Sequence, residues 1–169
     1  MVEGDQPSAA WPTYSLQQLD TAINNARQAG KYLFIWDKQG QVATFMQYKA
    51  QLLSLGPHLI KSQLGQITPQ EVGEEIRKAF VYGMRNGENL CLDVDALSPD
   101  WSQFDQENTF SAEQFFNFEE MKKEENFMKY VRESENHGIG GLNPGFGYTR
   151  SPDFGMQIRS AATSEEQIS

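Results

Sequence analysis

The fold is decided by a short apolar stretch that ends in an acidic residue and a turn. Its residues are Tyr32-Leu33-Phe34-Ile35-Trp36-Asp37-Lys38-Gln39-Gly40. A strand buried on both faces of a sheet carries a continuous apolar run rather than an alternating one. The first five residues therefore predict a central β-strand. The remaining four predict a tight turn in which Gly40 adopts a positive φ angle.

Amphipathic segments flank this strand on both sides. Upstream, Ser15 can cap a helix that runs to about Ala29, and Gly30 is suited to end it. Downstream, four apolar side chains at helical spacing predict a helix over residues 42–55, which Gly56-Pro57 would end. These side chains are Phe45, Tyr48, Leu52 and Leu55.

The pattern of strand and helix then repeats. A brief apolar run at residues 58–61 predicts a weak second strand. Thr68-Pro69-Gln70-Glu71 combines an N-cap, a proline at the first helical position and a capping box, and so begins a helix that Asn86-Gly87 would stop. Leu90-Cys91-Leu92-Asp93-Val94 is another apolar strand ending in acid. This order predicts an α/β fold, a small parallel sheet with flanking helices.

The second half of the chain has a different composition. Ser111-Ala112-Glu113-Gln114 is a second capping box and predicts a charged helix to about Glu133. Six of the chain's 14 glycines fall between Gly138 and Gly155, and such a segment cannot build a core of its own. We therefore expect three parts: an irregular N-terminal arm (1–14), an α/β domain with a C-terminal helix (15–135) and an extended Gly/Pro/aromatic tail (136–169).

Charge and composition narrow the classes of partner. The formal net charge is −9, and only 14 Lys and Arg residues are present in 169. Nucleic-acid binding needs a clustered basic face, and anionic membranes repel an acidic protein, so neither partner is expected. No apolar run approaches the roughly 20 residues that span a bilayer. One cysteine and no visible secretory signal suit a soluble protein of the cytoplasm.

Residues that could carry chemistry are few. Asp37 and Asp93 lie where predicted strands end, which is where open α/β sheets bind ligands, and Asp93 could associate with magnesium. The chain has no Gly-x-x-x-x-Gly-Lys-Ser/Thr loop to hold phosphates, and Cys91 is expected to be buried. His58 and His137 lack metal-ligand spacing. We therefore predict no catalytic residue, no cofactor and no metal, and hence no enzyme.

The predicted tail carries more aromatic and arginine side chains than polar disordered segments usually do. Such residues can order on a partner's surface as anchors. We expect the partner-binding residues to be Phe146, Tyr148, Arg150, Phe154 and Arg159.

One part of the chain resembles a known family. The run from Leu33 to Tyr48 resembles a segment in the C-terminal region of IQ-motif and ankyrin-repeat proteins, and also the strand and turn of the degenerate fifth AAA+ module of dynein heavy chains. The likeness covers about residues 31–95. It continues through Ile67-Thr68-Pro69-Gln70-Glu71, Ala79-Phe80-Val81-Tyr82-Gly83 and Leu90-Cys91-Leu92-Asp93-Val94.

This resemblance implies a P-loop-like fragment without its P-loop, used as a scaffold in a ciliary or cytoskeletal setting. Lys38 replaces the family's usual proline, and the chain has no ankyrin repeats and no basic IQ-type helix, so calmodulin binding does not transfer.

Together these features predict a non-catalytic structural protein that acts through protein–protein interaction in a large assembly. The expected setting is the ciliary axoneme or another microtubule-associated part of the cytoskeleton, with tubulin or axonemal proteins as neighbours. Two alternatives stay open: a nucleotide or small-metabolite binding protein that uses the ends of the strands, and a subunit of another complex, such as a mitochondrial one.

Overall fold

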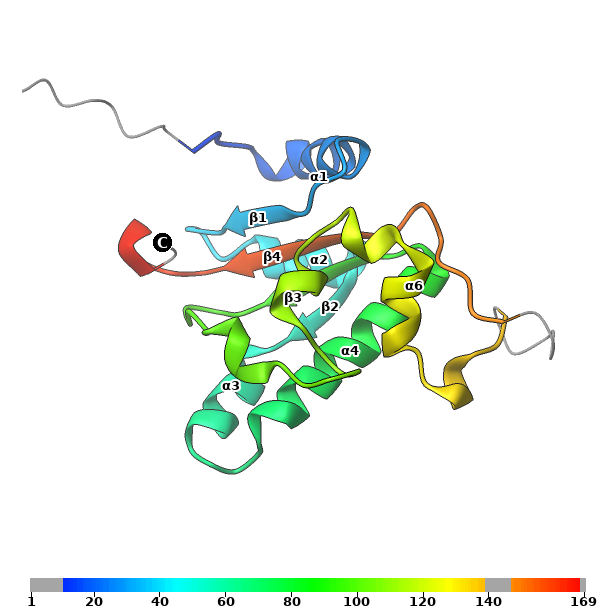
Figure 1. Ribbon diagram of the computed structural model, residues 1–169. Helices are drawn as coiled ribbons and strands as arrows, with labels where there is room; N and C mark the ends of the chain where they lie inside the picture. Colours follow the sequence, from blue (N-terminus) through cyan, green and yellow to red (C-terminus); the bar gives the residue numbers. More distant parts are fainter. Residues whose placement is uncertain (1–10, 139–146, 168–169) are drawn as a thin grey trace, which may run out of the picture.

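Four parallel strands form one sheet at the centre of the molecule (Figure 1). The computed structural model describes residues 11–138 and 147–167. The strands are β1 (Leu33–Trp36), β2 (Gln51–Ser54), β3 (Asn89–Asp93) and β4 (Gly155–Ser160). Their spatial order is β1-β4-β3-β2, and every neighbouring pair is parallel. The predicted fold class is therefore confirmed.

Helices cover both faces of this sheet. On one face lie α1 (Leu19–Gln28) and α2 (Val42–Lys49), whose Leu19, Ile23 and Met46 pack around Cys91. On the other lie α3 (Gly56–Gln63) and α4 (Pro69–Asn86), against Leu90 and Leu92. Figure 1 shows α1 and α4 on opposite sides of the strands. Short elements complete the list: α5 (Ala112–Phe115), α6 (Glu124–Phe127) and 3₁₀ turns at Leu16–Gln18, Trp101–Phe104, Glu120–Lys122, Met128–Tyr130, Glu133–Glu135 and Glu165–Gln167.

Helix α4 forms as its sequence predicts. The Thr68 hydroxyl accepts the backbone N–H of Glu71 at 3.2 Å, and the Glu71 carboxylate accepts the backbone N–H of Thr68 at 2.6 Å. These bonds satisfy two of the amides that a helix start leaves without partners. At the other end Gly87 adopts φ +68°, the left-handed conformation that ends a helix and that only glycine reaches without strain.

Three strand assignments differ from the sequence prediction. Helix α2 ends at Lys49, and residues 51–54 form β2 instead of continuing the helix to residue 55. Residues 58–61 lie within α3 and do not form a strand. Strand β1 is an edge strand, not a central one, because within the described residues it pairs only with β4.

The apolar residues after Lys49 explain why the sequence pattern predicted a longer helix in place of β2. Leu52 and Leu53 alternate across the sheet and pair with Cys91 and Leu92 of β3. Their spacing from Phe45 also fits a helix, so the pattern alone was ambiguous. Tyr48, which the helical stripe would bury, is 84% exposed.

The long helix predicted from residue 112 to 133 is also wrong. The Ser111 hydroxyl does cap α5, but that helix ends at Phe115. The Asn117 side chain then accepts the backbone N–H of Glu120, and the Asn126 amide bonds the carbonyl of Glu120. Local bonds of this kind compete with helix formation, so the segment breaks into short turns that still bury its phenylalanines.

The predicted C-terminal tail is wrong for its described part. Residues 155–160 form β4, which inserts between β1 and β3 and hydrogen-bonds to both. Two apolar residues, Met156 and Ile158, alternate with Gln157 and Arg159, so the run is too short and polar to stand out in the sequence. The described residues after 146 therefore belong to the same folded unit as residues 15–135.

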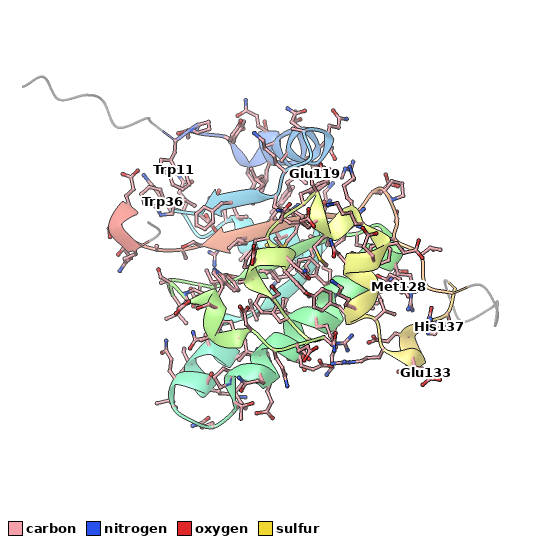
Figure 2. All side chains as sticks on the ribbon, viewed as in Figure 1. Trp11, Trp36, Glu119, Met128, Glu133 and His137 are labelled. Carbon is pink, nitrogen blue, oxygen red and sulfur yellow. The ribbon has the colours of Figure 1, made fainter. Side chains whose placement is uncertain are left out.

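Part of the predicted N-terminal arm is also packed. The Trp11 ring lies 5.7 Å from Phe34 and 6.0 Å from Trp36, and its indole N–H donates to Glu165 at 2.9 Å. Figure 2 shows Trp11 beside Trp36 at the edge of the sheet. Residues 1–10 lie outside the described part of the chain.

Candidate functional site

The carboxyl ends of the strands bring two acids and an arginine together. Asp37 follows β1, Asp93 ends β3, and Arg159 lies on β4 between them. In the sheet register Arg159 stands opposite Ile35 on one side and Asp93 on the other. The two acids predicted at strand ends therefore do share one edge of the sheet, as parallel strands require.

Arg159 links both acids. Its Nε and Nη2 donate to Oδ2 of Asp37 at 3.0 and 2.8 Å, and its Nη1 donates to Oδ1 of Asp93 at 3.0 Å. The side chains are 7%, 3% and 13% exposed for Arg159, Asp37 and Asp93. Burial alone lowers the pKa of Arg159, but the hydrogen bonds to the two acids raise it above its usual range. The arginine therefore stays charged inside the fold.

Asp37 has a second role at the start of α2. Its carboxylate accepts the backbone N–H groups of Gln41 at 3.2 Å and Val42 at 3.0 Å. Helix N-termini attract anions because their first amides point outward and the helix dipole is positive there. Gly40, at φ +73°, lets the turn bring the carboxylate back to these amides. The anion at this helix start is thus the chain's own Asp37.

The chemistry available at this edge is limited. Burial raises the pKa of the neighbouring Cys91 thiol to about 12, and Asp93 adds to the rise, so the thiol is a poor nucleophile. Among the described residues no group of three or more His, Cys, Asp or Glu side chains could hold a metal ion. No helix in the described ranges is long and apolar enough to cross a membrane. The charged groups of Asp37, Asp93 and Arg159 are all hydrogen-bonded within the fold.

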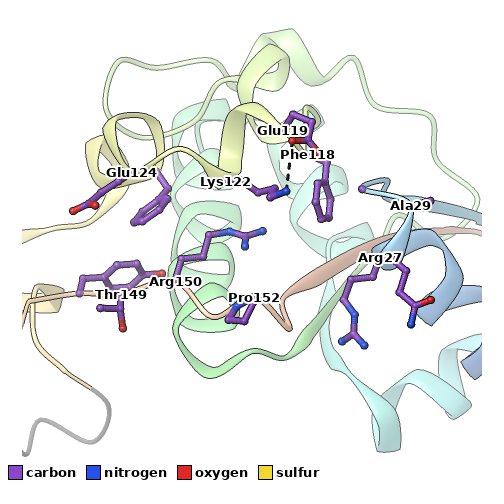
Figure 3. Close-up of a pocket in the computed structure, with 13 residues that line it drawn as sticks. Arg27, Ala29, Phe118, Glu119, Lys122, Glu124, Thr149, Arg150 and Pro152 are labelled. Atoms are coloured by element: carbon purple, nitrogen blue, oxygen red, sulfur yellow. Dashed lines mark ion pairs between the residues drawn. The ribbon is translucent and has the colours of Figure 1, made fainter.

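A second feature is a cavity of about 660 Å³ on another side of the molecule (Figure 3). The end of α1, the segment around residues 118–127 and residues 148–152 enclose it. Arg27, Lys122 and Arg150 contribute positive charge, whereas Glu119 and Glu124 contribute negative charge. Its walls include Phe118, Phe127, Tyr148 and Pro152.

The five residues predicted to bind a partner have different locations. Tyr148 and Phe154 are buried; the Tyr148 hydroxyl donates to the carbonyl of Val81 at 2.6 Å, and Phe154 packs on Phe80 at 5.6 Å. Arg159 is buried in the ion-pair cluster, so these three side chains pack inside the fold and are not exposed anchors. Arg150 lines the cavity and is only partly buried. Phe146 lies outside the described residues.

Sequence reasoning also missed a structural arginine, Arg77. It is 2% exposed and donates to Glu74, to Glu135 and, at 2.7 Å, to the carbonyl of Tyr130. It thereby fastens α4 to the segment after α6. Glu74 on α4 is therefore an ion-pair partner. Nothing local in the sequence signals this, because Glu135 is distant along the chain.

Comparison of the chain with family models, with curated proteins and with solved structures gave no match.

Proposed function

We propose that this chain is a non-catalytic structural subunit of a large protein assembly and acts by binding its protein neighbours. The observation that supports this most is the filled edge of the sheet. Open α/β sheets bind ligands beyond the carboxyl ends of their strands. Here Arg159 donates hydrogen bonds to both acids at that edge, and Asp37 accepts the helix amides that a phosphate would need.

The proposed setting is the ciliary axoneme or another microtubule-based part of the cytoskeleton. Its support is the resemblance of residues 31–95 to dynein and to IQ-motif and ankyrin-repeat proteins. Tubulin surfaces are acidic, as is this chain with its net charge of −9. Docking to tubulin or an axonemal neighbour would then depend on local contacts within the roughly 8–10 Å reach of screened charges.

The exposed surface offers apolar side chains for such contacts. Tyr48 is 84% exposed, Leu64 67% and Tyr82 52%. Both edge strands of the sheet, β1 and β2, have one neighbour each in the described structure. Exposed aromatic residues and open strand edges are common features of protein–protein contacts.

Thermal unfolding in the presence of nucleotides tests the non-catalytic part of the proposal. The alternative function, nucleotide or small-metabolite binding, is favoured only by the meeting of Asp37 and Asp93 at one edge. A ligand at 100 times its dissociation constant would stabilise the fold by about 2.7 kcal/mol. We expect no shift with ATP, ADP or GTP plus magnesium, and a shift of that size would overturn the proposal.

Cross-linking mass spectrometry on the native assembly tests the structural role. We expect the chain's exposed lysines to give reproducible cross-links to the same few neighbours. A chain that cross-links to no constant neighbour would not be a subunit. Axonemal neighbours would support the ciliary setting, and mitochondrial neighbours would place the chain in the other complex considered above.

A further inference from the structure

Arg150 is a charged residue whose hydrogen bonds are incomplete. Its Nη1 donates to the carbonyl of Ser151 at 3.2 Å, but its buried Nε and Nη2 have no hydrogen-bond partner among the described residues. The guanidinium lies 5.9 Å from the centre of the Phe118 ring and 5.4 Å from that of Phe154. Buried charges in proteins are normally paired, because an unpaired one costs several kcal/mol of desolvation.

A second buried polar group near Arg150 also lacks a hydrogen-bond partner among the described residues. The Tyr32 hydroxyl is buried without a hydrogen-bond partner in the described chain, and its ring packs on Phe118 at 5.2 Å. Burial raises the pKa of Tyr32, while the positive charge of Arg150 acts in the opposite direction. Two unsatisfied polar groups thus lie near Phe118, and of the two Arg150 lines the cavity together with Phe118.

The remaining cations of the cavity face the same space. Figure 3 shows Arg150 and Lys122 extending toward Phe118, with Arg27 across the opening. Lys122 is ion-paired to Glu119 at 3.5 Å, but the two side chains are 49% and 66% exposed, and exposed pairs of this kind are weak. Three cations and two acids line the cavity, so one positive charge is left over.

We propose that this cavity binds a carboxylate side chain of an acidic peptide from a neighbouring protein. A small turn of the partly buried Arg150 side chain would present its planar N–H groups to the carboxylate, which they match in geometry. Lys122 would break its ion pair with Glu119 and pair with the incoming carboxylate instead. Phe118 and Pro152 would contact the aliphatic part of the peptide. A single excess positive charge suits a carboxylate better than a phosphate dianion, which Glu119 and Glu124 would repel.

We assign the peptide to another chain because the segment of this chain that adjoins the cavity in sequence offers no acid to enter it. The segment between residues 138 and 147, which precedes Arg150 and lies outside the described structure, contains no acidic residue. Residues 1–10 contain Glu3 and Asp5, and they are tested below as competitors. The inference rests on the proposed protein-binding role and names the chemistry of one partner.

Fluorescence anisotropy with a labelled peptide of alternating Glu and Gly tests the site on the full chain. We expect the peptide to bind and its Gln-Gly counterpart to bind at least about tenfold more weakly. Lys122→Gln and Arg27→Gln should each weaken binding by about fivefold, and Arg150→Met should abolish it. Equal binding of the two peptides would overturn the proposal.

Lys78→Gln is the matched control. Lys78 is 54% exposed and pairs with Glu75 three residues earlier, as Lys122 is 49% exposed and pairs with Glu119, but Lys78 is not part of the cavity. It should leave binding within about twofold of the parent. An equal loss in Lys78→Gln would mean that net charge alone drives binding, and the cavity would not be the site.

Two further measurements separate the competing ligands. If inorganic phosphate displaces the peptide far better than acetate does, the cavity is a phosphate site and the proposal of a carboxylate ligand is rejected. Stronger peptide binding after removal of residues 1–10 would show that Glu3 or Asp5 is the occupant. If the peptide does not bind and no nucleotide stabilises the chain, this inference alone is rejected. If a nucleotide does stabilise the chain, the proposed function is rejected.

Discussion

Two arginines in the same part of the sequence have opposite surroundings. Arg159 donates to Asp37 and Asp93 from all three of its nitrogens inside the sheet edge. Arg150 lies between two aromatic rings, and two of its nitrogens have no partner among the described residues. The first charge is ion-paired within the fold, whereas the second forms no salt bridge among the described residues.

The difference separates a structural charge from a candidate binding charge. A buried ion pair that is fully bonded has nothing to offer a ligand, and breaking it is expensive to the fold. A charge that the fold buries without a partner keeps its capacity to bind an anion from outside. The sheet edge, where ligands were expected, is therefore closed, and the candidate site lies instead in a cavity that sequence reasoning did not find.

Truncation before β4 should lower the stability of the fold more than any other change, because it removes both of the arginines compared above. Without residues 148–169 the sheet loses the strand that joins β1 to β3, together with both arginines. We expect no cooperative unfolding transition and no near-ultraviolet circular dichroism signal. A chain ended after Ser164 is the control. It loses the Trp11–Glu165 and Ser98–Gln167 hydrogen bonds and should lose about 1–2 kcal/mol of stability. A shorter chain that folds normally would restore the tail hypothesis.

Arg159→Met and Arg150→Met compare the two charges directly. Removing Arg159 leaves Asp37 and Asp93 as unpaired acids at the sheet edge, so the free energy of unfolding should fall by about 3–5 kcal/mol. Removing Arg150 takes away a charge whose Nε and Nη2 have no hydrogen-bond partner in the described chain while methionine keeps its aliphatic bulk, so the free energy of unfolding should fall by no more than about 1 kcal/mol. Urea unfolding measures both. Equal losses would mean that Arg150 is as structural as Arg159.

The sequence indicated the parallel sheet, the turn at Gly40 and the limits of α4, because each depends on local signals. The capping box at Thr68 and the left-handed Gly87 act within a few residues of the helix they bound. Strand β4 could not be found in this way. Its stability comes from two neighbours, β1 and β3, that lie far away in the sequence.

The roles of the arginines were unpredictable for the same reason. Asp37 and Asp93 were recognised as acids at strand ends, but their counter-charge arrives on β4. Arg77 similarly depends on Glu135, which only the folded chain brings near. A buried acidic residue at the end of a strand needs hydrogen-bond donors or a cation, and that need is a signal that could have led to Arg159.

Acid should weaken the third arginine cluster, that of Arg77. The hydrogen bond from Arg77 lowers the pKa of Glu74; burial raises the pKa of Glu135, but bonds from Arg77 and the Arg132 backbone lower it overall. Groups with a lowered folded-state pKa stabilise the fold above their unfolded value of 4.5 and lose this contribution as pH falls through the folded value. Unfolding free energy should therefore decline between about pH 5 and pH 2.

Arg77→Met is the control for this acid dependence. Without the guanidinium, the two carboxylates lose the partner that lowers their pKa, so the Arg77-dependent part of the slope of stability against pH should disappear. Urea unfolding at a series of pH values measures the slope. An unchanged slope in the variant would mean that other acids cause the acid sensitivity.

The smallest expected change in stability is that of two lysine variants, which distinguish an effect on peptide binding from an effect on folding. Lys122→Gln and Lys78→Gln each remove an exposed ion pair between residues three positions apart, with distances of 3.5 and 3.0 Å. Exposed pairs of this kind contribute about 0.5 kcal/mol or less, so both variants should unfold at nearly the same urea concentration as the parent. Because their stabilities match, a loss of acidic-peptide binding in Lys122→Gln alone must come from the cavity. A Lys122→Gln variant that is clearly less stable than Lys78→Gln would instead make Lys122 part of the fold.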